Sequence, residues 1–335
     1  MSRAGRTPLI RLGAGWLLCV AVLLYTLPTP AQAAPPTPPI CGLRVAGVKL
    51  KDHSLFYHAG FYYLISIRIV LPEPPNGRGE DALLVARSAD RCTWEVMGTA
   101  LTHGAAGTPD ESYLWAPHVL RFGETWYMYY TGVNRNIAQS IMLATNPDPT
   151  QWGNWTRQPM LFQPNHAGMI YGGADTWSDA RDPMVLPYQD RYLLYYTGVD
   201  TSGGIVGVAD SHTPAGTWRD LGAVLREQPG VIPESPFVLE QAGYYYLVYN
   251  AAGAGAVRWH WAISPFGPWQ AGGTLAHGWA HDFWRMEDGT WLVSYIVGNG
   301  TAIRVEPLNW IAGDPPAPLV GQRVLLPLVV RGTGE

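Results

Sequence analysis

One spacing, repeated five times, constrains what this 335-residue chain can fold into more than any other feature of its sequence. In each copy a key position stands ten residues before an aromatic residue that opens a second apolar run. A few apolar residues and a turn come between them, which is the pattern of a β-hairpin. The five pairs, with the key position first, are Asp52 and Tyr62, Ala116 and Trp126, Asp182 and Tyr192, Ser235 and Tyr245, and His281 and Trp291. The count needs no gap, so the sequence predicts five equivalent units.

A second hairpin completes each unit. After the aromatic run comes a strand that contains alanine, then a turn or a proline, and then a tryptophan. The recurring tryptophans are Trp94, Trp155, Trp218, Trp269 and Trp310. Four strands in each of five units is the arithmetic of a β-propeller, whose blades are four-stranded antiparallel sheets around a central axis. We therefore expect an all-β, five-bladed β-propeller over residues 45–311, with a β-sandwich as the alternative fold.

The two ends of the chain have a different character. Arginines precede an apolar run at 13–27, and the small residues Ala31 and Ala33 follow it, so residues 1–33 are predicted to be a secretory signal peptide. Residues 34–44 are a proline-rich spacer, and residues 312–335 are a proline-rich linker with a short apolar tail. No run after the signal peptide is long enough to span a bilayer. We expect a monomer that is secreted or held at the cell surface.

The cysteines indicate the cellular compartment of the chain, and its charge limits the classes of partner that it can bind. Removal of the signal peptide leaves two cysteines, Cys41 and Cys92. A single pair in an exported chain favours a disulfide over two free thiols. Charged residues make up only 14% of the chain, and its net charge is -4. Because binding to phosphates needs a basic surface, nucleic acid is excluded as the expected partner.

The key positions differ in chemistry, although the fold alone would make them alike. The first strand of each propeller blade lines the axis, so equivalent positions face one central funnel. Two copies carry an aspartate, Asp52 and Asp182, a third has Glu234 directly before its key position, and a fourth has His281. Burial and like charges disfavour ionised carboxylates, so gathering three of them in one cleft is costly. Their convergence therefore indicates a functional site.

These segments resemble the five-bladed propeller glycosidases of glycoside hydrolase family 43, and more loosely the arabinosidase, invertase and levansucrase group. The resemblance extends over about residues 45–311 and depends on the order and spacing of short motifs. The motifs are Lys51-Asp52-His53-Ser54, Trp115-Ala116-Pro117-His118-Val119, Arg181-Asp182-Pro183, Glu234-Ser235-Pro236, and the His281 segment before Asp288-Gly289-Thr290-Trp291.

Such enzymes use three carboxylates, and the resemblance implies a role for each one here. Asp52 would be the general base that activates water, Asp182 would hold the acid and tune its pKa, and Glu234 would be the general acid. Inverting hydrolysis needs an acid and a base about 6.5–9.5 Å apart on opposite sides of the sugar. The implied reaction is single-step, inverting hydrolysis of an arabinofuranosyl or xylosyl bond in a polysaccharide or oligosaccharide.

Four further residues are assigned to the carbohydrate substrate. His281 matches a position where the family often has a histidine near the axis, close to the sugar or to a bound cation. Trp115 and Trp177 lie beside the motifs and are candidates for stacking on sugar faces, and Arg181 directly precedes Asp182. The resemblance requires no cofactor and allows a structural Ca²⁺ on the axis, although the chain has no dense loop of oxygen ligands.

Two departures from the family pattern keep other functions open. The first motif has His53 where the family has proline, and the nucleophile motif of the retaining, fructan-cleaving relatives is missing. Propellers also host many functions. The alternatives to an inverting glycosidase are therefore a retaining fructan hydrolase-like enzyme, a non-catalytic carbohydrate-binding propeller, and a structural surface protein with unused acids.

Overall fold

The computed structural model describes residues 41–75, 79–166 and 180–321. The predicted signal peptide, most of the spacer, the apolar tail and Trp177 lie outside these ranges. The described chain is built of β-strands and one short 3₁₀ turn, η2 at Gly298–Gly300. None of the described residues forms a helix that is long and apolar enough to cross a membrane.

Four blades each consist of four antiparallel strands that pair in chain order. Blade one contains β2 (Val48–His58), β3 (Phe61–Val70), β4 (Ala82–Ser88) and β5 (Glu95–Thr102). Blade two contains β6 (Tyr113–Phe122), β7 (Thr125–Val133), β8 (Ser140–Asn146) and β9 (Thr156–Arg157). Blade three contains β10 (Arg181–Tyr188), β11 (Arg191–Asp200), β12 (Gly203–Ser211) and β13 (Arg219–Arg226). Blade four contains β14 (Ile232–Gln241), β15 (Tyr244–Ala252), β16 (Ala256–Ala262) and β17 (Gln270–Leu275).

Blade five is completed by strands from both ends of the described chain. Its consecutive strands are β18 (Trp279–Arg285), β19 (Trp291–Val297) and β20 (Ala302–Ile311). Two more strands, β1 (Gly42–Leu43) and β21 (Ala317–Val320), pair with different parts of β20. Gly42 is needed at this seam, because a Cβ there would lie 2.3 Å from the Ile303 carbonyl oxygen. β1 and β21, which lie outside residues 45–311, thus join the sheet of blade five.

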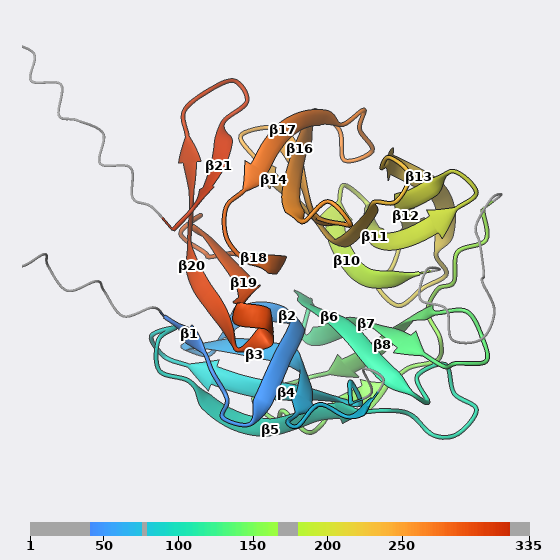
Figure 1. The fold of residues 1–335 in the computed structure, drawn as a ribbon, viewed down its shortest axis with the longest axis vertical. Coiled ribbons are helices and arrows are strands. Elements are labelled where there is room, and N and C mark those ends of the chain that lie inside the picture. Colours follow the sequence, from blue (N-terminus) through green and yellow to red (C-terminus); the bar gives the residue numbers. More distant parts are fainter. Residues whose placement is uncertain (1–40, 76–78, 167–179, 322–335) are drawn as a thin grey trace, which may run out of the picture. The chain divides into compact units, whose positions relative to one another are not determined.

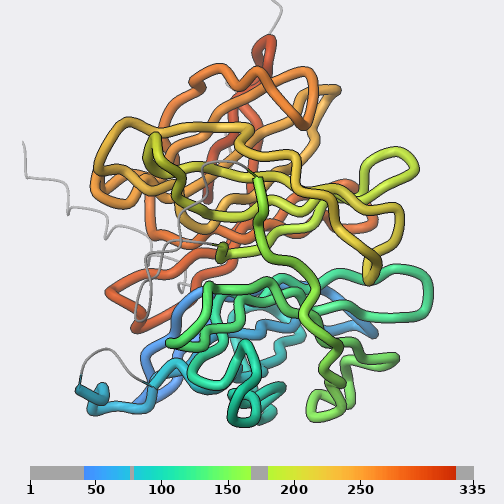
Figure 2. Tube along the Cα trace, turned by 90° about the vertical axis from the view of Figure 1, so that its right-hand side faces the viewer, coloured from blue at the N-terminus to red at the C-terminus, as the bar shows by residue number. Residues whose placement is uncertain are grey.

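The first strands of the blades close a ring. β2 contacts β6 and β18, β10 contacts β6 and β14, and β14 contacts β18. Figure 1 shows these five strands turned toward the middle of the ring, with the later strands of each blade farther out. In Figure 2 blades one and two, in blue to green, lie below blades three to five, in yellow to red. The predicted five-bladed β-propeller is confirmed.

Aromatic side chains join neighbouring blades. The rings of Phe56 and Trp126 lie 5.0 Å apart between blades one and two, and those of Phe237 and Phe283 lie 5.0 Å apart between blades four and five. Burial of such rings stabilises the fold by about 2–3 kcal/mol each. The predicted disulfide is also confirmed, because Cys41, directly before β1, is bonded to Cys92 in the β4–β5 turn of blade one.

Candidate active site

Each first strand carries one β-bulge near its start, and the bulges face the axis. The two residues outside the ladder are Lys51 and Asp52 in β2, Ala116 and Pro117 in β6, Asp182 and Pro183 in β10, Ser235 and Pro236 in β14, and Ala280 and His281 in β18. Proline is tolerated here because a bulge residue need not donate to the ladder. The first bulge residue has a φ of 44° at Ala116, 58° at Asp182, 50° at Ser235 and 51° at Ala280. Four blades thus share one left-handed backbone shape.

The fifth blade departs from the gap-free count. Its first bulge residue is Ala280, so His281 does not occupy the position of the other key residues. The cause is the β18–β19 turn, where the Met286 amide donates to the Thr290 carbonyl at 2.8 Å across three residues. The equivalent turns of the other blades have two residues. Trp291 therefore follows Ala280 by eleven residues rather than ten.

The first blade is shifted as well. The ladder between β2 and β3 is one residue pair longer on the turn side of the bulge than in blades two to four, and its last pair before the bulge is His53 with Ser66. Lys51 is therefore the first bulge residue, and Asp52 is the second. Even so, Asp52 and His281 line the same pocket as the other key residues.

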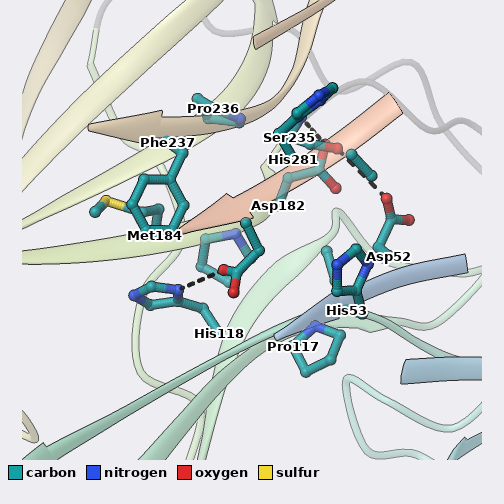
Figure 3. A pocket seen from close by; sticks show the side chains of 14 residues that line it. Asp52, His53, Pro117, His118, Asp182, Met184, Ser235, Pro236, Phe237 and His281 are labelled. Atoms are coloured by element: carbon teal, nitrogen blue, oxygen red, sulfur yellow. Dashed lines mark hydrogen bonds and ion pairs between the residues drawn. The ribbon is translucent and has the colours of Figure 1, made fainter. Parts of the chain in front are cut away.

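All five blades contribute to this pocket. Its lining includes Asp52, Asp182, Ser235 and His281, four of the residues that the sequence placed around the funnel, whereas Glu234, directly before Ser235, is not among the described lining residues. Figure 3 shows that the Asp52 side chain, from blade one, points toward Asp182 and Ser235, from blades three and four. The bulges thus bring together residues that are separated by up to about two thirds of the chain.

Hydrogen bonds fix the two aspartates relative to blade four. The Asp182 Oδ2 accepts a hydrogen bond from the Ser235 amide at 2.9 Å and another from the Thr197 hydroxyl at 3.0 Å. The Asp182 amide in turn donates to the Thr131 hydroxyl of blade two at 3.0 Å. Across the pocket, the Ser235 hydroxyl donates to Asp52 Oδ1 at 3.4 Å (Figure 3). Asp182 is therefore held from three blades at once.

Glu234 is anchored by a cation from blade three. The Arg181 Nη2 donates to Glu234 Oε1 at 2.9 Å, and Arg181 is itself buried. The Glu234 side chain remains 39% exposed, which leaves it more accessible than Asp182, whose side chain is 8% exposed. Arg181, which the sequence assigns to the substrate, thus contacts the predicted general acid directly.

The charge around Asp52 favours its protonated form. Burial raises the pKa of Asp52 to about 7, and the nearby carboxylates of Asp182, Glu80 and Glu234 act in the same direction. Lys51 opposes them, since its ammonium favours an ionised neighbour. Burial lowers the pKa of Lys51, but the carboxylates of Asp52 and Glu80, the latter in an ion pair with Lys51, raise it on balance.

The pocket histidines are neutral or paired. Burial lowers the pKa of both His53 and His281 to about 3, so neither carries a charge near neutral pH. The His281 ring stacks on Tyr295 with the centroids 5.3 Å apart. His118 Nδ1 lies 3.8 Å from the buried Asp282 carboxylate, which also accepts a hydrogen bond from the Leu55 amide.

Of the two tryptophans that were predicted to stack on sugar, the structure describes one, Trp115. Trp115 is not among the described residues that line the pocket, and its ring stacks on Tyr113 at 6.3 Å and packs on the core between blades one and two. Trp177 lies outside the described residues. Within the described ranges, no group of three or more His, Cys, Asp or Glu side chains is placed to hold a metal ion. The axial Ca²⁺ stays a prediction.

The sequence did not single out the residues that orient the carboxylates. Thr131, Thr197 and Asn250 occupy the same place on the second strand of their blades, each opposite the residue before the bulge. Thr131 and Asn250 accept hydrogen bonds from amides of the next blade, those of Asp182 and Ala280. The single proton of the Thr197 hydroxyl is shared between Asp182 Oδ2 and the Pro233 carbonyl of the next blade. A signal was present, because Thr131 and Thr197 both follow Tyr-Tyr and precede Gly-Val.

Comparison with known proteins finds similarity to glycosyl hydrolases. The family described as Glycosyl hydrolases family 43 matches residues 45–176. Arabinan endo-1,5-alpha-L-arabinosidase C of Emericella nidulans is 28% identical over 173 residues, which is 49% of this chain and 49% of that protein. The extracellular exo-alpha-(1->5)-L-arabinofuranosidase of Streptomyces avermitilis is 23% identical over 257 residues, 70% of this chain and 48% of that protein. The chain thus spans about half the length of the curated relatives it matches.

Solved structures share the fold. The GH43_1 enzyme from Xanthomonas citri, complexed with xylotriose, is 20% identical and superimposes with a TM-score of 0.61 over 83% of this chain and 92% of that chain. At this identity the likeness concerns the fold alone. The chain is therefore similar to the glycosyl hydrolases of family 43, in sequence over its first two blades and in fold over its five-bladed propeller.

Proposed function

We propose that this chain is a secreted glycoside hydrolase that cleaves arabinofuranosyl or xylosyl bonds by single-step inversion. The observation that carries the proposal is that Asp52 and Asp182, from two blades, line one axial pocket, while Glu234 directly precedes the lining residue Ser235 and its charge acts on Asp52. The names of the relatives, two of which are arabinan- or arabinofuranoside-cleaving and one of which is extracellular, support the substrate class and the location. The xylotriose complex of the structural neighbour supports the xylosyl alternative.

The environments of the carboxylates support a division of labour. Glu234, the more exposed one, donates a proton to the departing glycosidic oxygen as the bond to the anomeric carbon breaks. Asp52, on the blade across the pocket, takes the proton of the water that attacks the same carbon from the opposite face. Asp182 positions both, through the Ser235 amide. Since the pKa of Asp52 is about 7, the base is fully ionised only above neutral pH.

Substitution of the two outer carboxylates tests the proposal. Glu234→Ala should abolish hydrolysis of an arabino- or xylo-oligosaccharide but retain activity on a dinitrophenyl glycoside, whose leaving group needs no proton. Asp52→Ala should abolish both activities. Proton NMR of the first product should show the inverted anomer. Glu124→Ala, at an exposed turn residue, is the matched control.

Three results would contradict the proposal. Full oligosaccharide hydrolysis by Glu234→Ala would show that Glu234 is not the general acid. Retained configuration in the product would exclude single-step inversion. Binding of oligosaccharides by the unaltered chain without turnover, across arabinan and xylan substrates, would instead establish a carbohydrate-binding propeller.

A further inference from the structure

The fold does not require a hydroxyl at Ser235. Its backbone lies in the left-handed region, with a φ of 50°, where a side chain is disfavoured. Ala116 and Ala280 adopt the same conformation at the same bulge position of blades two and five. The two residues that depart from this small, inert side chain are Asp182 and Ser235, and both of them reach polar partners in the pocket.

The hydrogen bonds around Ser235 determine where its single proton points. Asn250 Oδ1 is occupied by the Ala280 amide at 3.1 Å, so its Nδ2 faces the Ser235 Oγ at 3.4 Å. The hydroxyl therefore accepts from Asn250 and has one proton left to donate. Its acceptor is Asp52 Oδ1, 3.4 Å away on blade one. Both contacts are long, as catalytic hydrogen bonds often are before substrate binds.

We propose that Ser235 is a positioning residue, which connects the two aspartates of the site and directs the Asp52 carboxylate toward the attacking water. Its amide donates to Asp182 Oδ2 at 2.9 Å, and its hydroxyl donates to Asp52 Oδ1. It also directly follows Glu234 in the chain. One residue of blade four thus connects all three carboxylates. The inference rests on the proposed function, in which Asp52 is the base.

The charge around Asp52 gives the hydroxyl a measurable effect. The charged groups that face Asp52 are Asp182, Glu80 and Glu234, which disfavour its ionised form, and Lys51, which favours it. A hydrogen bond donated to a carboxylate stabilises the ionised form. Loss of the Ser235 hydroxyl therefore raises the pKa of Asp52, and the base becomes protonated up to a higher pH.

The test measures kcat and KM of the full chain between pH 5 and pH 9 for Ser235→Ala and Ser235→Gly. Both variants lose the hydroxyl and keep the amide, and glycine also eases the left-handed backbone. We expect kcat to fall by about tenfold with little change in KM, and the acidic limb of kcat/KM to move up by roughly half to one pH unit in both variants. An unmoved acidic limb in both variants would overturn the proposal, and so would a limb that moves in only one of them, since that would trace the effect to the backbone.

Ala242→Gly, at an exposed turn residue with a φ of 54°, controls for easing a left-handed backbone away from the pocket.

A second measurement separates this inference from the proposed function, because it needs no substrate. The chain is labelled with ¹³C at the aspartate carboxyl carbons, and the Asp52 signal is assigned by its loss in Asp52→Asn. Its titration midpoint should rise in Ser235→Ala by the same half to one unit. A higher midpoint in a chain that hydrolyses no glycoside would sustain the Ser235–Asp52 contact and reject the enzymatic role. An unchanged midpoint in an active enzyme would reject the contact and leave the glycosidase intact.

Discussion

Asp52 shows what a buried carboxylate costs a fold. Its pKa rises from 3.8 in the unfolded chain to about 7 in the folded one, chiefly through burial, so the folded state binds the proton more tightly. The stability therefore falls as the pH rises from about 4 to about 7 and stays low above that window. We expect Asp52→Asn to raise the melting temperature by several degrees at pH 8 and to change it little at pH 4.

Differential scanning calorimetry at the two pH values measures this difference. Asp81→Asn, at an exposed aspartate of the same blade, serves as the control and should shift neither value. Equal stabilisation by Asp52→Asn at pH 4 and pH 8 would show that packing, and not charge, is the cause.

At the same scale, the sequence singled out candidate acids but not the residues that hold them. Asp52 and Asp182 could be expected at the axial pocket because each one departs from its siblings at a repeated position, and Glu234 stays a candidate beside it. Thr197 and Asn250 could not be singled out, since their hydrogen bonds reach across to the next blade and depend on how two sheets pack. Nor could the pairing of Arg181 with Glu234, which are 53 residues apart, be read from local pattern.

Between neighbouring blades, tyrosine hydroxyls act as links. Tyr129 and Tyr195, from the second strands of blades two and three, donate to the carbonyls of Pro214 and Pro265 in the following blade, at 2.9 Å and 2.7 Å. Tyr195 is completely buried, so Tyr195→Phe leaves the Pro265 carbonyl without this donor. We expect a loss of about 1 kcal/mol in the free energy of unfolding, measured by urea denaturation.

Tyr62→Phe, at a partly exposed tyrosine of blade one, is the comparison, and it should change stability by less than about 0.5 kcal/mol. An equally small effect of Tyr195→Phe would mean that the link between blades three and four adds nothing to stability.

The strands themselves were predictable, and their exact register was not. Turns of two residues made the ten-residue count correct for Ala116, Asp182 and Ser235. One extra turn residue in blade five and an earlier bulge in blade one moved His281 and Asp52 off that count by one. A bulge shifts the alternation of side chains by one residue, but these bulges lie so close to the strand starts that few residues remain before them to reveal the shift.

At the scale of the whole molecule, the disulfide lies next to β1, the strand that pairs with β20 in blade five. Cys41 and Cys92 are 51 residues apart. On the chain-entropy account, closing a loop of that size raises the free energy of the unfolded chain by about 4 kcal/mol. The double variant Cys41→Ser, Cys92→Ser should therefore unfold at a clearly lower temperature than the oxidised chain. A reducing agent should lower the melting temperature of the oxidised chain to that of the double variant, and it should leave the melting temperature of the variant unchanged. Identical melting of all three samples would contradict a stabilising role.

The way in which blade five is built also determines the order in which its strands can pair during synthesis. β1 is synthesised before blade one, yet its partner β20 is made after the other four blades. A chain that emerges from its N-terminus must therefore keep β1 waiting without a ladder partner until β20 has been made. Cys92 arrives much sooner, with the third turn of blade one, so the disulfide can secure the waiting strand early. Pairing of β1, the first of the described strands, with the late strand β20 thus completes blade five.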